Sequence, residues 1–293
     1  MIITGMRRCG KSVLLDRVRR SSLESDCYFN FEDERLVNFT AQDFQVLLET
    51  FIELFGHQKT FFFDEIQNIN GWEMFLRRLY NSGNKILVTG SNASLFSQEM
   101  GTKLTGRHIP ITVLPFSFAE YASFNGNLKS TNVSMSTVQK GAIKKLYGEY
   151  SRLGGIPGYV KYQKKEYLHS LCEGIIYRDI VARYNISNAE VLKKLAFYLA
   201  SSCGKEVTYS SLRKLLGIGS ATTVSDYCNH IEKSFLCFFL SRYSDSVKAQ
   251  QQLPKKVYFI DHVLAQTLGF RTSDDSGRML ENVVFLELKR NYN

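Results

Sequence analysis

Length, composition and charge narrow the class of protein before any motif is considered. The chain has 293 residues, of which 44% are hydrophobic and 22% charged, so it can bury a sizeable core in two domains and is not a disordered chain. Its six cysteines include no Cys-x-x-Cys pair, and no apolar run is long enough to span a bilayer. With no signal peptide, we expect reduced thiols, no membrane contact and a cytoplasmic protein.

The chain opens with a strand, a glycine-rich loop and a helix. Residues 1–4 are apolar and β-branched, and residues 5–12 read Gly-Met-Arg-Arg-Cys-Gly-Lys-Ser. The two glycines let the loop turn its N–H groups toward phosphate oxygens, Lys11 reaches the β- and γ-phosphates, and the Ser12 hydroxyl ligates Mg²⁺. The alternative is a glycine-rich turn that binds nothing. The spacing favours a loop that binds ATP and Mg²⁺ through Gly5, Met6, Arg7, Arg8, Cys9, Gly10, Lys11 and Ser12.

The first half of the chain alternates strands with helices, which is typical of a mostly parallel sheet. A polar stretch at 125–136 reads as a loop or short linker. Helices at 139–153 and 161–184 follow, and Gly154-Gly155-Ile156-Pro157 ends the first of them. The patterns predict further strands at 27–31, 60–64, 85–90 and 109–114 and helices at 41–55 and 72–80.

The pattern changes after residue 189. Helices at 190–202, 209–216 and 220–235 are followed by strands at 238–241 and 256–260, which is the order of a winged helix-turn-helix. A last helix is predicted at 277–289. The chain therefore divides into a P-loop ATPase core at 1–124, a linker and helical segment at 125–188, and a winged helix with the start of a further domain at 189–293. Both ends look cut, so we expect an incomplete chain.

Two carboxylates stand at the end of the apolar strand at 60–64. A buried strand rarely ends in two acids by accident, so Asp64 is expected to hold Mg²⁺ and Glu65 to polarise the attacking water. General-base help of this kind contributes roughly 10²–10⁴-fold to rate. The alternative is a solvated strand end.

The next strand ends in Thr89-Gly90-Ser91-Asn92. Asn92 or Ser91, and less favourably Thr89, can contact the γ-phosphate or orient the water. A turn that needs only the geometry of Gly90 explains the segment nearly as well.

Arg107 is the candidate for contacting the γ-phosphate, either in its own chain or on a neighbouring copy in a homo-oligomer. An exposed arginine is an equal alternative, and Arg77 and Arg78 are weaker candidates. Cys9 precedes the helix next to a lysine, a position that lowers the pKa of a thiol. We therefore hypothesise a reactive thiol that ATP protects, against the alternative of an inert small residue.

A combination of segments spread over nearly the whole chain is more specific than the P-loop alone. They are Gly-Met-Arg-Arg-Cys-Gly-Lys-Ser at Gly5, Phe-Phe-Asp-Glu-Ile-Gln at Phe62, Val-Thr-Gly-Ser-Asn-Ala-Ser at Val88, Leu-Thr-Gly-Arg at Leu104, Leu-Pro-Phe-Ser-Phe-Ala-Glu-Tyr at Leu114, Gly-Gly-Ile-Pro at Gly154, Tyr-Arg-Asp-Ile at Tyr177 and Gly-Arg-Met-Leu-Glu-Asn at Gly277. In these the chain resembles a prokaryotic family of AAA-type P-loop ATPases with an uncharacterised C-terminal region.

The resemblance implies an α/β P-loop core with parallel sheet order 5-1-4-3-2, then a helical segment and a winged helix. Family members usually carry a stretch before the first strand that helps to cover the nucleotide, and they continue into a region resembling restriction-endonuclease folds. Glu281 stands where the first acid of that fold would lie, but the following acids and lysine are absent. The sequence therefore predicts no nuclease activity.

The net charge of +9 permits an acidic partner such as double-stranded DNA, although a plain basic surface explains part of it. The helix at 220–235 has one lysine, Lys233, against Asp226 and Glu232, which is poor for gripping phosphates. Packing or protein binding by the winged helix is the alternative.

The sequence as a whole predicts Mg²⁺-dependent ATP hydrolysis coupled to a winged helix. The alternative is a nucleotide-gated protein- or DNA-binding module with little or no hydrolysis. A small-molecule kinase is less favoured, because the acidic pair suits activation of water.

Overall fold

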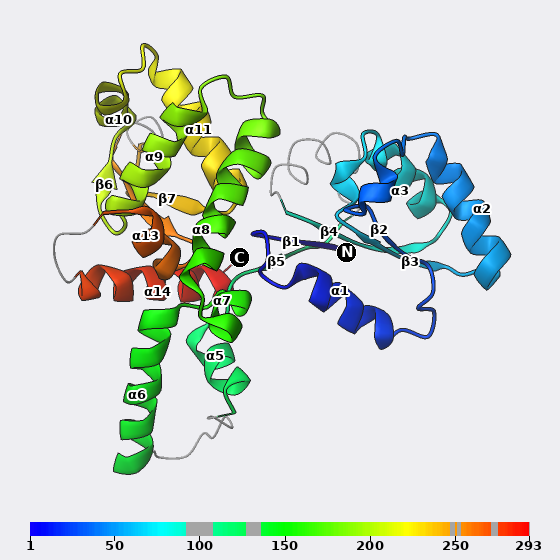
Figure 1. The fold of residues 1–293 in the computed structure, drawn as a ribbon, viewed down its shortest axis with the longest axis horizontal. Helices are drawn as coiled ribbons and strands as arrows, with labels where there is room; N and C mark the ends of the chain where they lie inside the picture. The colour runs from blue at the N-terminus through cyan, green and yellow to red at the C-terminus, as the bar shows by residue number, and fades with distance from the viewer. Residues whose placement is uncertain (92–107, 127–135, 247–249, 251–252, 271–274, 293) are drawn as a thin grey trace. The chain divides into compact units, whose positions relative to one another are not determined.

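The computed structural model describes residues 1–91, 108–126, 136–246, 250, 253–270 and 275–292 (Figure 1). The chain forms two compact units, Met1–Val113 and Leu114–Asn293. The division into three parts at residues 124 and 188 stays a prediction.

The first unit is built on a five-stranded parallel sheet. Its strands are β1 (Ile2–Gly5), β2 (Tyr28–Asn30), β3 (Thr60–Asp64), β4 (Lys85–Gly90) and β5 (Pro110–Val113). They lie in the order β2-β3-β4-β1-β5, and each neighbouring pair is parallel. This confirms the sheet order 5-1-4-3-2 and places the carboxyl ends of β1, β3 and β4 at one edge.

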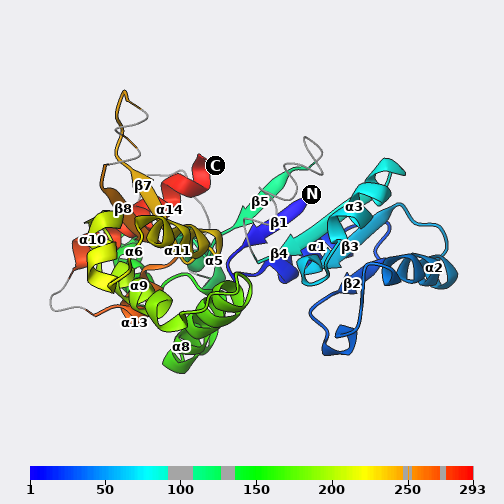
Figure 2. The ribbon, with the colours of Figure 1, turned by 90° about the horizontal axis from the view of Figure 1, so that it is seen from above.

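Helices cover both faces of this sheet (Figures 1 and 2). On one face, α1 (Lys11–Arg20) buries Leu15 against Ile3 and Phe62. On the other, α2 (Asp43–Phe55) and α3 (Trp72–Asn81) enclose an aromatic cluster, in which Phe44 and Phe75 stack with ring centroids 4.1 Å apart. Short 3₁₀ turns, η1 (Glu34–Leu36) and η2 (Ile66–Asn68), follow β2 and β3. The apolar strands are thus fixed from both sides, which holds their polar tips in place.

The second unit begins with helices. They are α5 (Phe118–Phe124), α6 (Thr137–Leu153), α7 (Pro157–Tyr162), α8 (Lys165–Glu173) and the π-helical η4 (Gly174–Ala182). Capping boxes at Ser117 and Ser136 start α5 and α6. The single helix predicted at 161–184 is wrong in detail, because Gln163 takes a left-handed conformation with φ 53° and separates α7 from α8.

The remainder of this unit combines helices with a small antiparallel sheet. The elements are α9 (Ala189–Ser201), β6 (Glu206–Val207), α10 (Tyr209–Leu216), α11 (Ala221–Lys233), β7 (Cys237–Ser241), β8 (Lys255–Phe259), α13 (His262–Leu268) and α14 (Ser276–Asn291). The sheet has the order β6-β8-β7, and β7 and β8 lie side by side in Figure 2.

The Gly-Arg-Met-Leu-Glu-Asn segment fastens α14 to β8. The fully buried Asn282 accepts a hydrogen bond from the Phe259 N–H (2.7 Å) and donates one to the Phe259 carbonyl (2.9 Å). Glu281 accepts hydrogen bonds from Lys256 Nζ and Tyr258 Oη, both at 2.6 Å. The segment thus has a packing role in this unit.

The Gly-Gly-Ile-Pro segment fills a similarly tight place. A Cβ on Gly154 would lie 2.4 Å from Asp261 Oδ1, and one on Gly155 would lie 2.2 Å from the Phe116 carbonyl. The buried Asp261 carboxylate accepts the Gly155 N–H at 2.7 Å. Glycine is therefore the residue that these positions accommodate.

None of the helices in the described ranges combines the length and apolar character that crossing a bilayer would require.

Candidate functional site

The loop between β1 and α1 has the backbone that its sequence predicts. Gly5 and Gly10 have φ of 145° and 105°, and Arg8 between them has φ 62°. A Cβ on Gly5 would lie 2.2 Å from the Val113 carbonyl oxygen, so no other residue fits there without displacing β5. The loop is therefore shaped by its glycines and braced against the neighbouring strand.

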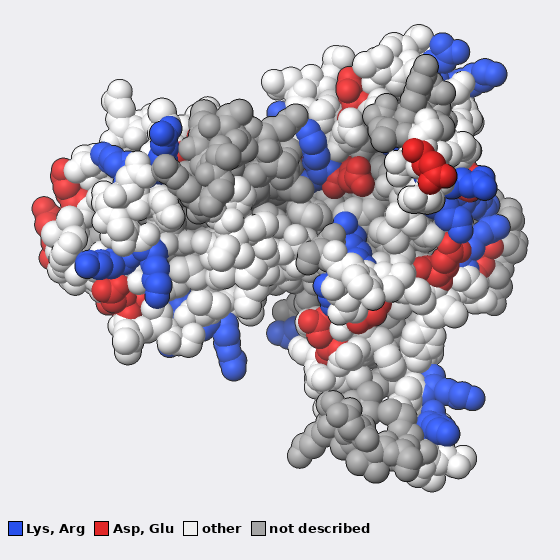
Figure 3. Space-filling view, turned by 180° about the vertical axis from the view of Figure 1, so that it is seen from behind, with Lys and Arg blue, Asp and Glu red and all other residues white. Residues whose placement is uncertain are grey.

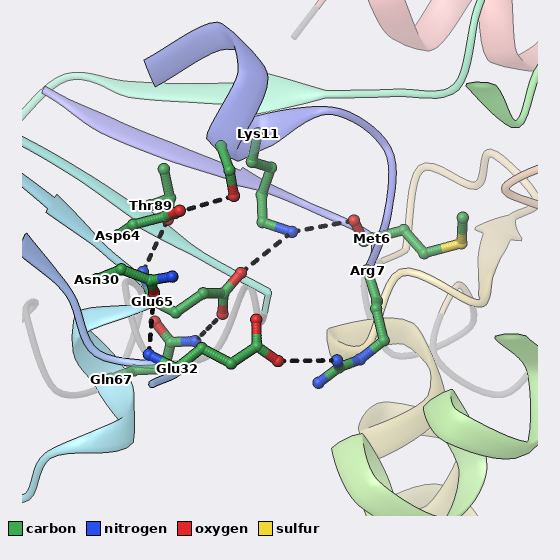
Figure 4. Close-up of polar contacts among 10 residues, drawn as sticks. Met6, Arg7, Lys11, Asn30, Glu32, Asp64, Glu65, Gln67 and Thr89 are labelled. Carbon is green, nitrogen blue, oxygen red and sulfur yellow. Dashed lines mark hydrogen bonds and ion pairs between the residues drawn. The ribbon is translucent and has the colours of Figure 1, made fainter. Parts of the chain in front are cut away.

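Lys11 turns back into this loop. Its side chain is almost completely buried, and Nζ donates to the Met6 carbonyl at 3.1 Å. The same nitrogen lies 3.6 Å from Glu65 Oε1 (Figure 4). The Cys9 N–H also donates to the Met6 carbonyl, at 3.3 Å. One ammonium group thus links the loop at the end of β1 to the acid that follows β3.

Asp64 is the centre of a second set of contacts. It is 3% exposed, and its Oδ1 accepts a hydrogen bond from Ser12 Oγ at 3.1 Å and another from the Thr89 hydroxyl. The Thr89 oxygen in turn accepts the Glu65 N–H at 2.9 Å. The tips of β3 and β4 and the first turn of α1 therefore meet at this carboxylate.

Glu65 is held in an uncommon conformation. Its φ of 51° and ψ of 40° lie in the left-handed region, which few non-glycine residues adopt. Its Oε2 accepts a hydrogen bond from Gln67 Nε2, while Oε1 faces Lys11 (Figure 4). Such a conformation persists where surrounding contacts determine it, as is common at functional sites.

These residues fit a magnesium ion and a polyphosphate. The Ser12 hydroxyl and the Asp64 carboxylate are the hard oxygen donors that Mg²⁺ prefers, and they lie within hydrogen-bonding distance of each other. Gly10 is the N-cap residue of α1, no side chain in the described structure caps this helix start, and the first turn of the helix carries no acid. An uncapped helix N-terminus beside a lysine attracts phosphate oxygens.

The expectation that the position of Cys9 lowers the pKa of its thiol is not met. Cys9 is 4% exposed, and burial raises the pKa of its thiol, which outweighs the opposing effect of Lys11. The neutral thiol is a poor nucleophile, so the alternative of an inert small residue accounts for this position.

The structure brings four of the predicted site residues together: Lys11, Ser12, Asp64 and Glu65. Arg7 is not part of this cluster, because its Nη1 forms an ion pair with Glu32 Oε1 at 3.3 Å. Arg8 is exposed. Asn92 and Arg107 lie outside the described residues. Their roles stay predictions.

Two residues of the cluster are not leading candidates from the sequence. Thr89 is the less favoured choice at its strand end, yet its fully buried hydroxyl joins Asp64 to Glu65. The sequence does not indicate Gln67, although it stands two residues after Glu65 in the Phe62 segment.

A cavity of about 690 Å³ lies at the opposite edge of the same sheet, where the strands begin. The residues that line it are mostly apolar and include the first residues of the strands, among them Met1, Thr60 and Lys85. None of the P-loop residues lines it, so it is separate from the site described above.

The P-loop, the sheet order and the two acids at the end of β3 together define an AAA-type P-loop fold. In agreement, a family model described as an AAA domain matches residues 1–122. A second model, a domain of unknown function (DUF8612), matches residues 144–275.

Two relatives match almost the whole chain. The uncharacterised protein MJ1544 of Methanocaldococcus jannaschii is 35% identical over 299 residues, covering 99% of this chain and 66% of that protein. An uncharacterised protein of Haemophilus influenzae is 32% identical over 304 residues, covering 99% of this chain and 74% of that protein. The chain belongs to the same family as these uncharacterised proteins and spans 66% of the length of the M. jannaschii relative.

Among solved structures, the ORC1 protein of Aeropyrum pernix in complex with DNA is 14% identical to this chain. The similarity covers 91% of this chain and 85% of that one, with a TM-score of 0.37.

Proposed function

We propose that the chain binds Mg-ATP in the P-loop and hydrolyses it, with Glu65 as the group that polarises water. The observation that carries this proposal is the placement of the Glu65 carboxylate 3.6 Å from the P-loop lysine and directly after Asp64. A base must lie beside the phosphate-binding group to act on a water that attacks the γ-phosphate.

The individual roles follow from the contacts. Lys11 and the N–H groups of the loop would bind the phosphates, and Ser12 and Asp64 would hold Mg²⁺. When bound, Mg²⁺ neutralises charge on the phosphate oxygens. Thr89 keeps Asp64 and Glu65 in register by donating to one and accepting from the other. Glu65 accepts a proton from the water.

The test is Glu65→Gln, which keeps the shape of the side chain and removes the base. The matched control is Glu53→Gln, because Glu53 is exposed on α2. We expect Glu65→Gln to lower kcat by roughly 10²–10⁴-fold while Mg-ATP binding persists, and the control to behave as wild type. Wild-type protein that binds Mg-ATP but never hydrolyses it, with any candidate partner, would instead be a nucleotide-gated binding module.

We infer that α9, β6, α10, α11, β7 and β8 form a winged helix whose partner is a protein. Their order supports the winged helix. Among the exposed positions of α11, Asp226 contributes a carboxylate and none is lysine or arginine, which suits duplex phosphates poorly. On the face shown in Figure 3, basic side chains stand in small groups among acidic ones rather than forming one basic surface.

Duplex DNA is the alternative partner, and salt dependence distinguishes the two. If the winged helix binds a protein, its affinity for a labelled DNA duplex is weak at physiological salt. Arg213→Ala, in the last turn of α10, then leaves this affinity unchanged. Tight duplex binding would contradict the inference if the logarithm of the association constant fell steeply with the logarithm of the salt concentration. The slope would be about 0.9 for each phosphate contact.

A further inference from the structure

The side-chain amide of Gln67 meets two different environments. Gln67 lies in η2, immediately after the acidic pair, and its Nε2 donates to Glu65 Oε2. Its Oε1 is buried and accepts no hydrogen bond within the described residues. One end of this amide therefore has a partner at the proposed base, and the other end is an acceptor without a donor.

The orientation of the amide follows from chemistry. An ionised carboxylate only accepts hydrogen bonds, so the NH₂ group of Gln67 must face Glu65. The carbonyl oxygen is then fixed on the other side of the same planar group.

Glu65 makes contacts with three residues around it. The Glu65 N–H is bound by Thr89, and its Oε1 faces Lys11 at 3.6 Å. The bond from Gln67 to Oε2 completes the set and sets the plane of the carboxylate.

We propose that Gln67 is a positioning residue for the proposed base Glu65. Its Nε2 donates to Glu65 Oε2 and orients the carboxylate that polarises the attacking water. The inference rests on the proposed ATP hydrolysis. In that step the water oxygen forms a bond to the γ-phosphorus, the bond from the γ-phosphorus to the bridging oxygen breaks, ADP leaves with the electron pair, and the water proton passes to Glu65.

Two variants test this role. Gln67→Met keeps the length of the side chain without the hydrogen bond to Glu65, and Gln67→Glu keeps the shape but cannot donate to Glu65. The same changes at Gln45 are matched controls, because Gln45 Nε2 also donates to a glutamate, Glu49 Oε1 at 2.8 Å, on the exposed surface of α2.

Two measurements separate positioning from folding. The first is steady-state ATP hydrolysis, and the second is calorimetric affinity for MgADP with and without aluminium fluoride, which mimics the phosphoryl group in transfer. We expect both Gln67 variants to bind MgADP as wild type does and to lose about 10- to 100-fold in kcat, the size of one hydrogen bond to a charged group. The gain in affinity on adding aluminium fluoride falls by a similar factor.

The failures of the two proposals are distinguishable. Suppose that Glu65→Gln abolishes hydrolysis, but that the Gln67 variants match their Gln45 controls both in kcat and in the gain in MgADP affinity on adding aluminium fluoride. The role of Gln67 is then overturned, and the proposal of ATP hydrolysis stands. If wild type does not hydrolyse ATP, or Glu65→Gln hydrolyses it at the wild-type rate, both proposals fall. If Gln67→Met does not fold, Gln67→Glu decides.

Discussion

Replacing Thr89 by valine should destabilise the first unit strongly, although valine has nearly the same shape. Thr89 is 0% exposed, and its hydroxyl is the only atom that valine changes in kind. That hydroxyl donates to Asp64 Oδ1 and accepts the Glu65 N–H at 2.9 Å. The substitution therefore leaves the partly buried Glu65 N–H without an acceptor and removes a donor from the buried Asp64 carboxylate.

The expected cost follows from these two losses. An unsatisfied buried N–H costs about 1–3 kcal/mol, and a hydrogen bond to a charged group contributes about 1.5–3 kcal/mol. The Ser12 hydroxyl still donates to Asp64, so the lower part of the second range applies. A total of about 2.5–5 kcal/mol is a large part of the roughly 5–15 kcal/mol that stabilises an ordinary domain.

Chemical denaturation, followed by circular dichroism, measures this loss in the full chain. Thr89→Ser keeps the hydroxyl and removes one methyl group, so it should cost about 1 kcal/mol. Thr50→Val removes a hydroxyl that donates to the Val46 carbonyl on the exposed surface of α2, and should stay within about 0.5 kcal/mol of wild type. The reasoning is refuted if Thr89→Val unfolds at the same denaturant concentration as Thr50→Val.

Three further predictions concern the P-loop and the last helix. Gly5→Ala should abolish Mg-ATP binding in calorimetry, because its Cβ would lie 2.2 Å from the Val113 carbonyl; undiminished affinity would contradict this. Cys9 should react with iodoacetamide far more slowly in folded than in urea-unfolded protein, since burial raises the pKa of its thiol, and equal rates would be inconsistent with that. Glu281→Gln should lower the free energy of unfolding at neutral pH, where the hydrogen bond from Lys256 holds the pKa of Glu281 below its ordinary 4.5. This stabilisation is present above pH 4.5 and is lost as the pH falls through the lowered pKa of Glu281. The free energies of unfolding of the variant and of wild type should therefore converge as the pH is lowered below 4.5, and should differ at neutral pH.

The sequence predicted the sheet and the centre of the site well for a physical reason. β3 and β4 have the predicted bounds, Thr60–Asp64 and Lys85–Gly90, because each is a β-branched or aromatic run that ends in polar residues or glycine. Once the strands are parallel and adjacent, their tips must meet at one edge. Lys11 and Ser12 follow from the loop spacing alone.

What the sequence did not reveal depends on backbone geometry and burial. Gln67 reaches Glu65 because that residue adopts a left-handed conformation, which no spacing rule indicates. The raised pKa of Cys9 follows from burial, whereas its position in the sequence showed only the neighbouring lysine and helix start. The two-residue β6 is too short to give a periodic pattern. One residue of the sequence could have indicated the start of α13. Asp261 is its N-cap, and the carboxylate accepts the Val263 N–H at 2.8 Å.

The amide of Asn282 has a consequence for self-association. It binds both backbone groups of Phe259, just beyond the short stretch of β8 that β6 covers, where the strand would otherwise offer its N–H and carbonyl to a strand from another molecule. Exposed strand edges of this kind nucleate aggregation, and proteins protect them by covering or blocking them. Helix α14, through the buried amide of Asn282, thus covers part of an edge that would otherwise invite intermolecular β-pairing.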